Sequence, residues 1–180
     1  MPISVRSPRS LASLAPALRA LVRAALRSEG RRAGEIGLLL ADDATLRRLN
    51  RDWRGLDRAT DVLSFGYDEA RAPRSLGARF ARRSAPIHGD LAVSMDRVRV
   101  QARRFRVTPG EELARLVVHG ALHLAGYDHR HAAERRDMRR REDRALRAAS
   151  APVRALARSR AARRARSSRR RMSRRSAAWR

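Results

Sequence analysis

Short apolar stretches and longer helical repeats alternate along the chain. Four of the short stretches predict strands, at residues 3–5, 36–40, 62–65 and 91–93. Residues 36–40 form an unbroken apolar run, which is typical of a buried strand. Ile3 and Val5 alternate with polar residues, so we expect this strand at an edge of the sheet.

Apolar residues at helical spacing predict helices between and after these strands. Their apolar positions predict helices over residues 11–25, 46–53, 95–106, 109–124 and 132–149. Asp42 or Asp43 is expected to cap the second of these helices. This helix is expected to turn Leu46, Leu49 and Trp53 toward the core.

The order of these elements limits the fold class. Two strand–helix pairs are followed by two strands and then by three helices, which predicts an α/β or α+β protein. Periodicity alone leaves the order of the strands in the sheet open. Residues 68–87, between the last two strands, contain proline, glycine and many arginines and predict a surface loop.

Composition divides the chain into two parts. Its length of 180 residues suits one domain with an extension, and an apolar fraction of 43% can supply a core. From residue 151 onward the chain has no acidic residue and many arginines, with alanine and serine between them. Such a block repels itself and cannot bury a core. We therefore expect a folded domain at residues 1–150 and a disordered, arginine-rich tail at residues 151–180.

The charge and the missing residue types narrow the function further. The formal net charge of +25 favours polyanionic partners, although every basic residue besides histidine is arginine, a uniformity that nucleotide composition bias can also produce. The absence of cysteine excludes disulfides and cysteine-ligated metals and fits a reducing cytoplasm. No apolar run reaches the roughly 18 residues of a membrane span. The N-terminus also lacks the apolar core of a secretory signal.

Three histidines indicate a metal site. His119 and His123 are four residues apart and therefore share one face of the predicted helix. Gly126 can end this helix with a positive φ, and the turn can bring His129 back as a third ligand. Three protein nitrogens around one Zn²⁺ leave the fourth position open for water, which is the catalytic rather than the structural arrangement.

The start of the histidine helix is also marked in the sequence. Thr108, Pro109 and Glu111 fit a capping box with proline at the first helical position. The histidine spacing matches the zinc-protease pattern H-E-x-x-H-x-x-G-x-x-H, but Gly120 stands where that pattern has its general-base glutamate. A zinc metalloprotease-like hydrolase is therefore an alternative that this glycine disfavours.

Three sequence blocks resemble the YbeY family of bacterial endoribonucleases. The segment HGALHLAGYDH, starting at His119, closely matches the family signature H-G-x-L-H-L-x-G-Y-D-H. The segment WRGLDRATDVLSF, starting at Trp53, and the segment GDLAVS, starting at Gly89, are similar to two further family blocks in the same order. The resemblance covers roughly residues 34–148. It implies an α+β fold in which helices cover one face of a small mixed sheet of about four strands, with the histidine helix central.

The same resemblance implies a function. It indicates a zinc-dependent, single-strand-specific endoribonuclease with one Zn²⁺ per chain and no small-molecule organic cofactor. Its expected role is the maturation of ribosomal RNA, at the 3′ end of the small-subunit RNA, together with ribosome quality control. The expected partners are ribosomal RNA, ribosomal particles and a ribosome-associated GTPase in the cytoplasm. A non-catalytic ribosome-assembly factor with a structural zinc is a further alternative.

Candidate site residues follow from the matched positions. Arg54 corresponds to the arginine that the family uses in catalysis, and its guanidinium suits two phosphate oxygens. Asp128 is expected to orient a ligating histidine rather than to carry protons. The expected lining of the cleft consists of Asp61, Ser64 and Phe65.

The helix at 132–149 departs from the family pattern. Most of its positions are acidic in the family, whereas arginine dominates here. Any partner contact that the family makes through this helix is therefore in doubt for this chain. His88 and His131 lie outside the signature and are expected at the surface.

Overall fold

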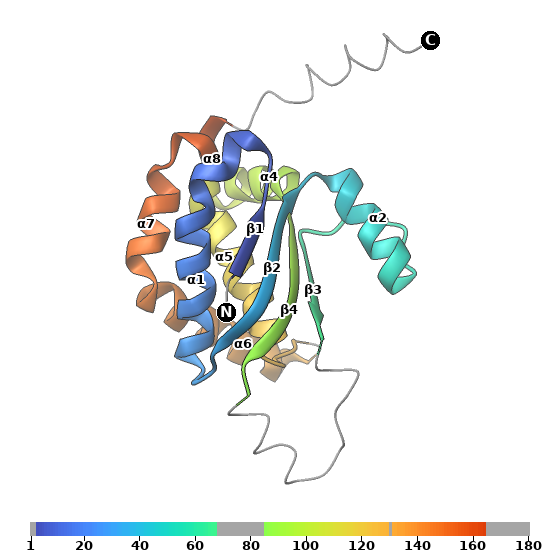
Figure 1. Cartoon of the computed structure of the whole chain (residues 1–180), viewed down its shortest axis with the longest axis vertical. Helices are drawn as coiled ribbons and strands as arrows, with labels where there is room; N and C mark the ends of the chain where they lie inside the picture. Colours follow the sequence, from blue (N-terminus) through green and yellow to red (C-terminus); the bar gives the residue numbers. More distant parts are fainter. Residues whose placement is uncertain (1–2, 68–84, 130, 165–180) are drawn as a thin grey trace.

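The chain forms one mixed sheet with helices packed against it (Figure 1). The computed structural model describes residues 3–67, 85–129 and 131–164. In this part of the chain the sheet has four strands in the order β1-β2-β4-β3. The strands are β1 (Ile3–Arg6), β2 (Ala33–Ala41), β3 (Val62–Gly66) and β4 (Ile87–Ser94).

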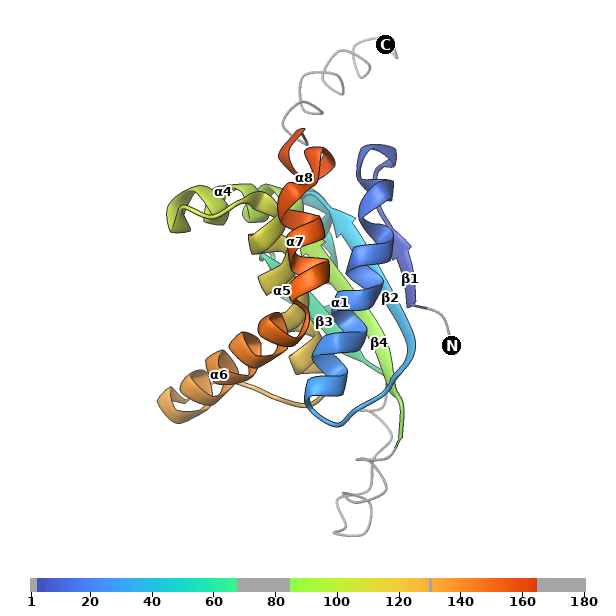
Figure 2. The same cartoon turned by 90° about the vertical axis from the view of Figure 1, so that its left-hand side faces the viewer.

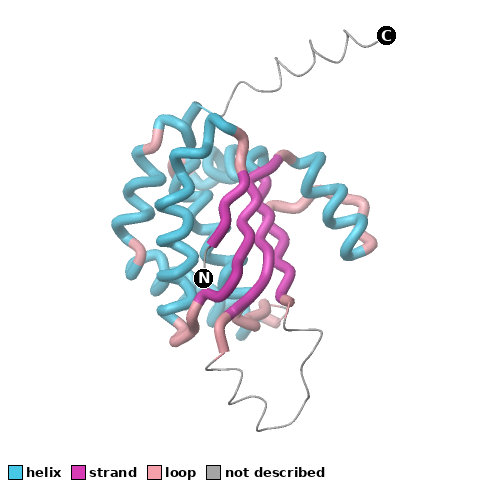
Figure 3. Tube along the Cα trace, viewed as in Figure 1, coloured by secondary structure: helices cyan, strands magenta, loops and turns pink. Residues whose placement is uncertain are grey.

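Both β1 and β4 run parallel to β2, whereas β3 is antiparallel to β4. Among the described residues, no strand pairs with the other edge of β3. Figure 3 shows the strands as one layer, with helices on both sides. The predicted α+β class and mixed sheet are therefore confirmed. The helices are η1 (Arg9–Leu14), α1 (Ala15–Ser28), α2 (Asp43–Arg54), α4 (Met95–Phe105), α5 (Pro109–Leu124), α6 (Ala132–Ala148), α7 (Ser150–Arg158) and α8 (Arg160–Arg164).

The two faces of the sheet have different neighbours. Successive strand residues point to opposite faces. Leu91 and Val93 belong to the main core, which α1 and α5 cover. Ala92, between them, belongs to a small cluster with Leu46 of α2 and Leu63 of β3. We call the first side the helical face and the second the open face, because α2 extends away from the sheet toward its C-terminal end (Figure 1).

Helix α5 is central on the helical face, as Figure 2 shows. The predicted capping box is present: the Thr108 hydroxyl accepts from the backbone N–H of Glu111, and the Glu111 carboxylate accepts from the backbone N–H of Thr108. Gly120 lets the helix approach the sheet closely. A Cβ on Gly120 would lie 2.9 Å from Leu91 Cδ2 and 3.1 Å from Val62 Cγ2. This close packing fixes the height of the histidines above the strands.

Trp53 was expected to face the core, and this expectation is wrong. Its side chain is 73% exposed, whereas Leu46 at the start of the same helix is fully buried. Asp42 caps α2 by accepting from the backbone N–H of Thr45, and Gly55 ends the helix with a φ of +70°. Because α2 diverges from the sheet, its last turn has no core to enter, and the Trp53 ring lies tilted beside that of Phe65, with the ring centres 6.1 Å apart.

The expected tail boundary at residue 150 also needs correction. Residues 151–164 are not disordered, because α7 and α8 continue the packed structure and bury Leu156 and Ala162. Sparse apolar residues at helical spacing outweighed the arginine-rich composition here. The remaining part of the expected tail, 165–180, and most of the expected loop, 68–84, lie outside the described residues. Within the described residues, none of the helices has the length and apolar character needed to cross a membrane.

Candidate metal centre

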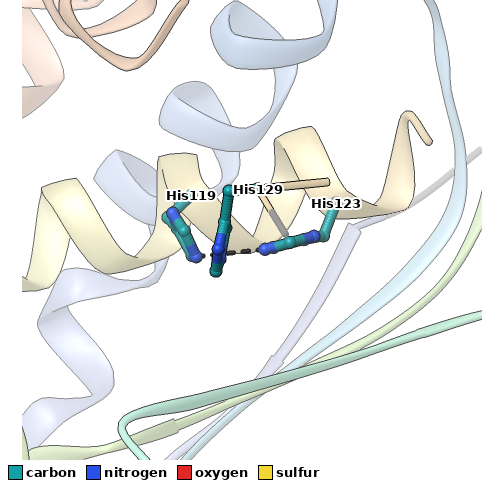
Figure 4. Close-up of side chains that lie close together, drawn as sticks. All are labelled: His119, His123 and His129. Carbon is teal, nitrogen blue, oxygen red and sulfur yellow. Dashed lines mark hydrogen bonds between the residues drawn. The ribbon is translucent and has the colours of Figure 1, made fainter. Parts of the chain in front are cut away.

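The three histidines of the signature converge on one point. His119 and His123 project from the same face of α5, and Gly126, with a φ of +91°, turns the chain back after the helix. His129 then lies against both, and one ring nitrogen from each histidine lies within 4.8 Å of the others. Figure 4 shows the three rings pointing toward one another. In the part of the chain that the structure describes, this is the group of side chains with the spacing of a metal site.

The geometry and chemistry of this group suit a metal ion such as zinc. The Nε2 atoms of His119 and His123 are 3.1 Å apart. Two nitrogens on a tetrahedral Zn²⁺, each about 2.0–2.1 Å from the metal, would be separated by about 3.3 Å. Burial lowers the pKa of His123 to about 4, with a further lowering from His119 and His129. His123 is therefore neutral at physiological pH and has a lone pair available for a metal.

A carboxylate that the sequence analysis did not assign completes the group. Glu142 of α6 lies with Oε1 2.5 Å from Nδ1 of His119. Both side chains are largely buried, with 13% and 18% of their surface exposed. Such a partner holds the proton on Nδ1 and presents Nε2 as the free ligand atom. The sequence signal was weak, because Glu142 is one acid in a helix dominated by arginine, 23 residues beyond His119.

The residue before Glu142 ties α6 to the rest of the fold. Arg141 pairs with Glu29, which follows α1, and with Asp137 one turn earlier in α6. Its guanidinium carbon also lies 4.0 Å from the centre of the Tyr127 ring, in the turn between His123 and His129. One arginine therefore connects α6, the end of α1 and the turn that carries the third histidine.

The other acidic candidate, Asp128, has a visible local role. Its Oδ1 accepts a hydrogen bond of 2.8 Å from the backbone N–H of His129. The expected contact of Asp128 with a ligating ring stays a prediction, whereas Glu142 contacts the ring of His119. Asp128 therefore stabilises the backbone at the third histidine.

The predicted cleft residues are distributed around β3. Asp61, just before the strand, accepts hydrogen bonds from Gln101 Nε2 and from the backbone N–H of Val62. These bonds lower its pKa and outweigh desolvation, the largest single influence, which acts to raise the pKa. Ser64 and Phe65 border a cleft of about 850 Å³ that extends along the sheet beside the last turn of α2.

Arg54 reaches the same strand from α2. Its Nη2 donates to the backbone carbonyl of Ser64 over 3.2 Å, and its guanidinium carbon lies 5.8 Å from the Phe65 ring centre. The side chain is exposed, so it remains accessible to a ligand. The structure thus brings Arg54 to the strand on which α5, the histidine helix, packs through Val62 and Gly120.

The two remaining histidines lie elsewhere. His88 is on β4, where its Nδ1 accepts from the backbone N–H of Glu35. His131 precedes α6, is exposed, and donates its backbone N–H to Glu134. Neither belongs to the group that could hold a metal.

Comparison with known proteins gives the family of the chain. Residues 7–150 match the family model described as endoribonuclease YbeY. The chain belongs to the YbeY family. Its relatives include the endoribonuclease YbeY of Anaeromyxobacter sp. (strain Fw109-5), which is 42% identical over 138 residues, covering 77% of this chain and 66% of that protein. The endoribonuclease YbeY of Desulfitobacterium hafniense is 43% identical over 106 residues, covering 59% and 66% of the two chains.

The matched part of this YbeY chain corresponds to slightly less than two thirds of those relatives. A solved structure has the same fold over a larger share. The solution structure of TM1509 from Thermotoga maritima aligns with a TM-score of 0.54 and 26% identity, covering 86% of this chain and 93% of the other. The family match, over residues 7–150, includes the histidine helix and strands β2, β3 and β4.

Proposed function

We propose that this YbeY chain is a zinc-dependent endoribonuclease that cleaves single-stranded RNA during ribosomal RNA maturation. The observation that carries the proposal is the convergence of the His119, His123 and His129 rings in a chain of this family. The carboxylate of Glu142 contacts Nδ1 of His119 on the side away from His123 Nε2. Three protein ligands are the number found in catalytic rather than structural zinc sites. When bound, zinc lowers the pKa of a coordinated water to about 7 and so supplies hydroxide near neutral pH.

The residues of the chain have distinct tasks in this proposal. His119, His123 and His129 hold the metal, and Glu142 keeps the Nδ1 proton of His119 in place. Arg54 binds the phosphate, since its planar fork can donate to two oxygens as negative charge increases there. The contact of Arg54 with the Ser64 carbonyl holds its side chain along β3 until a phosphate replaces that acceptor.

The proposed substrate is RNA within ribosomal particles. The net charge of +25 favours a polyanion, and phosphate contacts by arginine contribute affinity without sequence preference. Maturation of the 3′ end of the small-subunit RNA, ribosome quality control and contact with a ribosome-associated GTPase are parts of the proposal that the family resemblance supports. The proposed location is the cytoplasm, where these particles are assembled.

One assay tests the central claim. Purified protein is incubated with end-labelled single-stranded RNA, with and without a metal chelator, and with zinc restored after chelation. We expect cleavage that the chelator stops and zinc restores, and little cleavage of the same sequence in a duplex. A His131→Ala variant is the control, because His131 is an exposed histidine outside the metal-site group. Cleavage that persists after complete metal removal would refute the proposal.

The alternatives make different predictions in the same experiment. A metalloprotease would digest casein, but it needs a carboxylate where the chain has Gly120, and the space beside Gly120 is filled by Leu91 and Val62. A non-catalytic assembly factor would bind RNA and metal but leave the RNA intact. RNA cleavage, casein digestion and metal content, measured on the same preparation, therefore separate the three candidate functions.

A further inference from the structure

The open face of the sheet has an unusual set of exposed aromatic side chains. Trp53 at the end of α2 is 73% exposed, and Tyr67, just after β3, is 51% exposed. Phe65 is partly buried beside Trp53, with the two ring centres 6.1 Å apart. All three border the cleft of about 850 Å³. Only 4% of the chain is aromatic, so this concentration on one surface is not a general property of the protein.

The arrangement of these rings is held by specific contacts. Phe65 and Tyr67 are two residues apart near β3, and both border the cleft. The Tyr67 hydroxyl donates to Asp90 on the neighbouring β4. This bond raises the pKa of Tyr67 to about 12, so the hydroxyl remains a donor at physiological pH. A ring tied at its far end, with its faces exposed, loses little freedom when a flat partner stacks on it.

Charge favours one kind of flat partner. Arg6 and Arg54 border the cleft and are exposed, and the guanidinium of Arg54 lies beside the Phe65 ring. Asp90 is the opposing acid in the cleft, and the Tyr67 hydroxyl occupies one of its oxygens. Aromatic faces between arginines match single-stranded nucleic acid, whose bases stack while its phosphates pair with cations.

The position of the cleft relates it to the metal site. Both lie beside β3, which is one of the two edge strands of the sheet in the described part of the chain: Val62 lies against Gly120 of the histidine helix, whereas Phe65 borders the cleft. Arg54 contacts β3 between these two positions, at the Ser64 carbonyl. A single strand crossing the edge of β3 would therefore meet aromatic faces, then Arg54, then the histidines.

We propose that Trp53 and Tyr67 form a stacking platform that holds unpaired RNA bases on the open face while the adjacent chain crosses the edge of β3. The inference rests on the proposed function and deepens it, because it names unpaired bases as the recognised group. It gives a physical reason for a preference for single strands, since paired bases in a duplex do not present their faces.

The test compares a base-containing probe with an abasic probe of the same length and charge. Both are fluorescently labelled 2′-O-methyl oligonucleotides of about 12 nucleotides, a size within the range for one single-strand module. Their affinity for the metal-loaded protein is measured by anisotropy, and their integrity is checked on a gel. We expect the wild-type protein to bind the base-containing probe at least about fivefold more tightly than the abasic probe.

Variants assign this preference to the platform. Trp53→Ala should weaken binding of the base-containing probe by about fivefold or more and leave the abasic probe unchanged, whereas Trp53→Phe should retain most of the affinity. Tyr67→Ala should act in the same direction. Phe105→Ala is the matched control, because Phe105 is a 53% exposed aromatic on α4, away from the cleft lining. The slope of affinity against salt should remain that of the wild type in Trp53→Ala, because no phosphate contact is lost.

The outcomes are separable from those of the cleavage assay. Equal affinity for both probes in the wild type, or an equal loss in Phe105→Ala and Trp53→Ala, would overturn the platform. A protein that shows the base preference but cleaves no RNA would keep the platform and refute the proposed function. A protein that cleaves single strands without any base preference would keep the proposed function and refute the platform.

Discussion

The two faces of the sheet differ in how much freedom they leave their functional side chains. On the helical face, the histidines stand on a helix whose Gly120 touches two strands and whose His119 ring is backed by Glu142. On the open face, Trp53, Arg54 and Tyr67 are exposed, and Arg54 and Tyr67 each make a hydrogen bond to a strand, at the Ser64 carbonyl and at Asp90. The difference indicates a division of tasks, because a metal needs ligands at fixed distances, whereas a flexible polymer needs accessible surfaces.

His123→Ala should show the largest effect on the helical face. Removing one of three ligands should abolish stoichiometric zinc binding and RNA cleavage, and it should lower the melting temperature of the metal-loaded protein, because ligand energy is also folding energy. Elemental analysis and calorimetry measure these changes, with His131→Ala as control. Full zinc content in His123→Ala would show that the triad is not the metal site.

Arg54→Ala should lower RNA cleavage, a property of the open face, without changing metal binding on the helical face. We expect zinc content and melting temperature to remain at wild-type values, while single-turnover RNA cleavage falls by about 10²-fold or more, the scale for losing one donor to a transition state. Arg54→Lys should recover only part of the rate, since lysine lacks the planar fork. Arg48→Ala, on the same helix and bonded to Thr45, should cleave at the wild-type rate. A similar loss of cleavage in Arg54→Ala and Arg48→Ala would show that Arg54 contributes only positive charge and no specific contact with the phosphate.

Glu142→Gln tests how far metal affinity depends on the contact between the Glu142 carboxylate and Nδ1 of His119. Loss of such a partner typically costs about 10- to 100-fold in metal affinity, which competition with a zinc chelator can measure. The fold should persist, because Arg141 still ties α6 to Glu29. Asp143→Asn, which changes the exposed acid next in sequence, is the control. Unchanged affinity in Glu142→Gln would mean that the contact with His119 is incidental.

The smallest expected effect concerns the metal-free protein at mild acidity. Burial, His119 and His129 lower the pKa of His123 from 6.5 to about 4, so between these values the unfolded chain binds a proton that the folded chain does not. Stability should therefore fall as the pH decreases through this window and should be regained above it. Urea denaturation of the metal-free protein measures this, and His123→Gln should show a shallower dependence. Equal pH dependence in both proteins would contradict the assignment.

The fold class and the convergence of the three histidines could be predicted largely because their signals are local. The histidines, Gly126 and the Thr108 capping box occur within 22 consecutive residues, and the structure places each on the expected element. Strand order could not be predicted from periodicity, and the family resemblance implied only a mixed sheet of about four strands; the order β1-β2-β4-β3 came from the structure. Contacts between distant segments had no such signal, and the carboxylate of Glu142 at His119 is the clearest example.

The two errors have a common cause. Trp53 was assigned to the core because the spacing of apolar residues in α2 was taken to mean that its whole length lies on the sheet. Residues 151–164 were assigned to a disordered tail because arginine content was taken to outweigh Leu156 and Ala162. In both cases the outcome depended on which tertiary surface was available, and helix pattern alone does not contain that information.

The contact between α5 and α7 limits where the chain can be truncated for expression. A Cβ at Gly110 would lie 2.0 Å from the Leu156 carbonyl oxygen, so α7 docks where the start of the histidine helix offers only a hydrogen atom. The family match ends at residue 150, before this contact, and it begins at residue 7, after the buried Ile3. Cutting the gene at the limits of the alignment would remove Ile3 and Leu156 together, leaving apolar surface open to water beside β2 and at the start of α5. The limits of an expressed protein for biochemical work should therefore follow the packed core rather than the aligned segment.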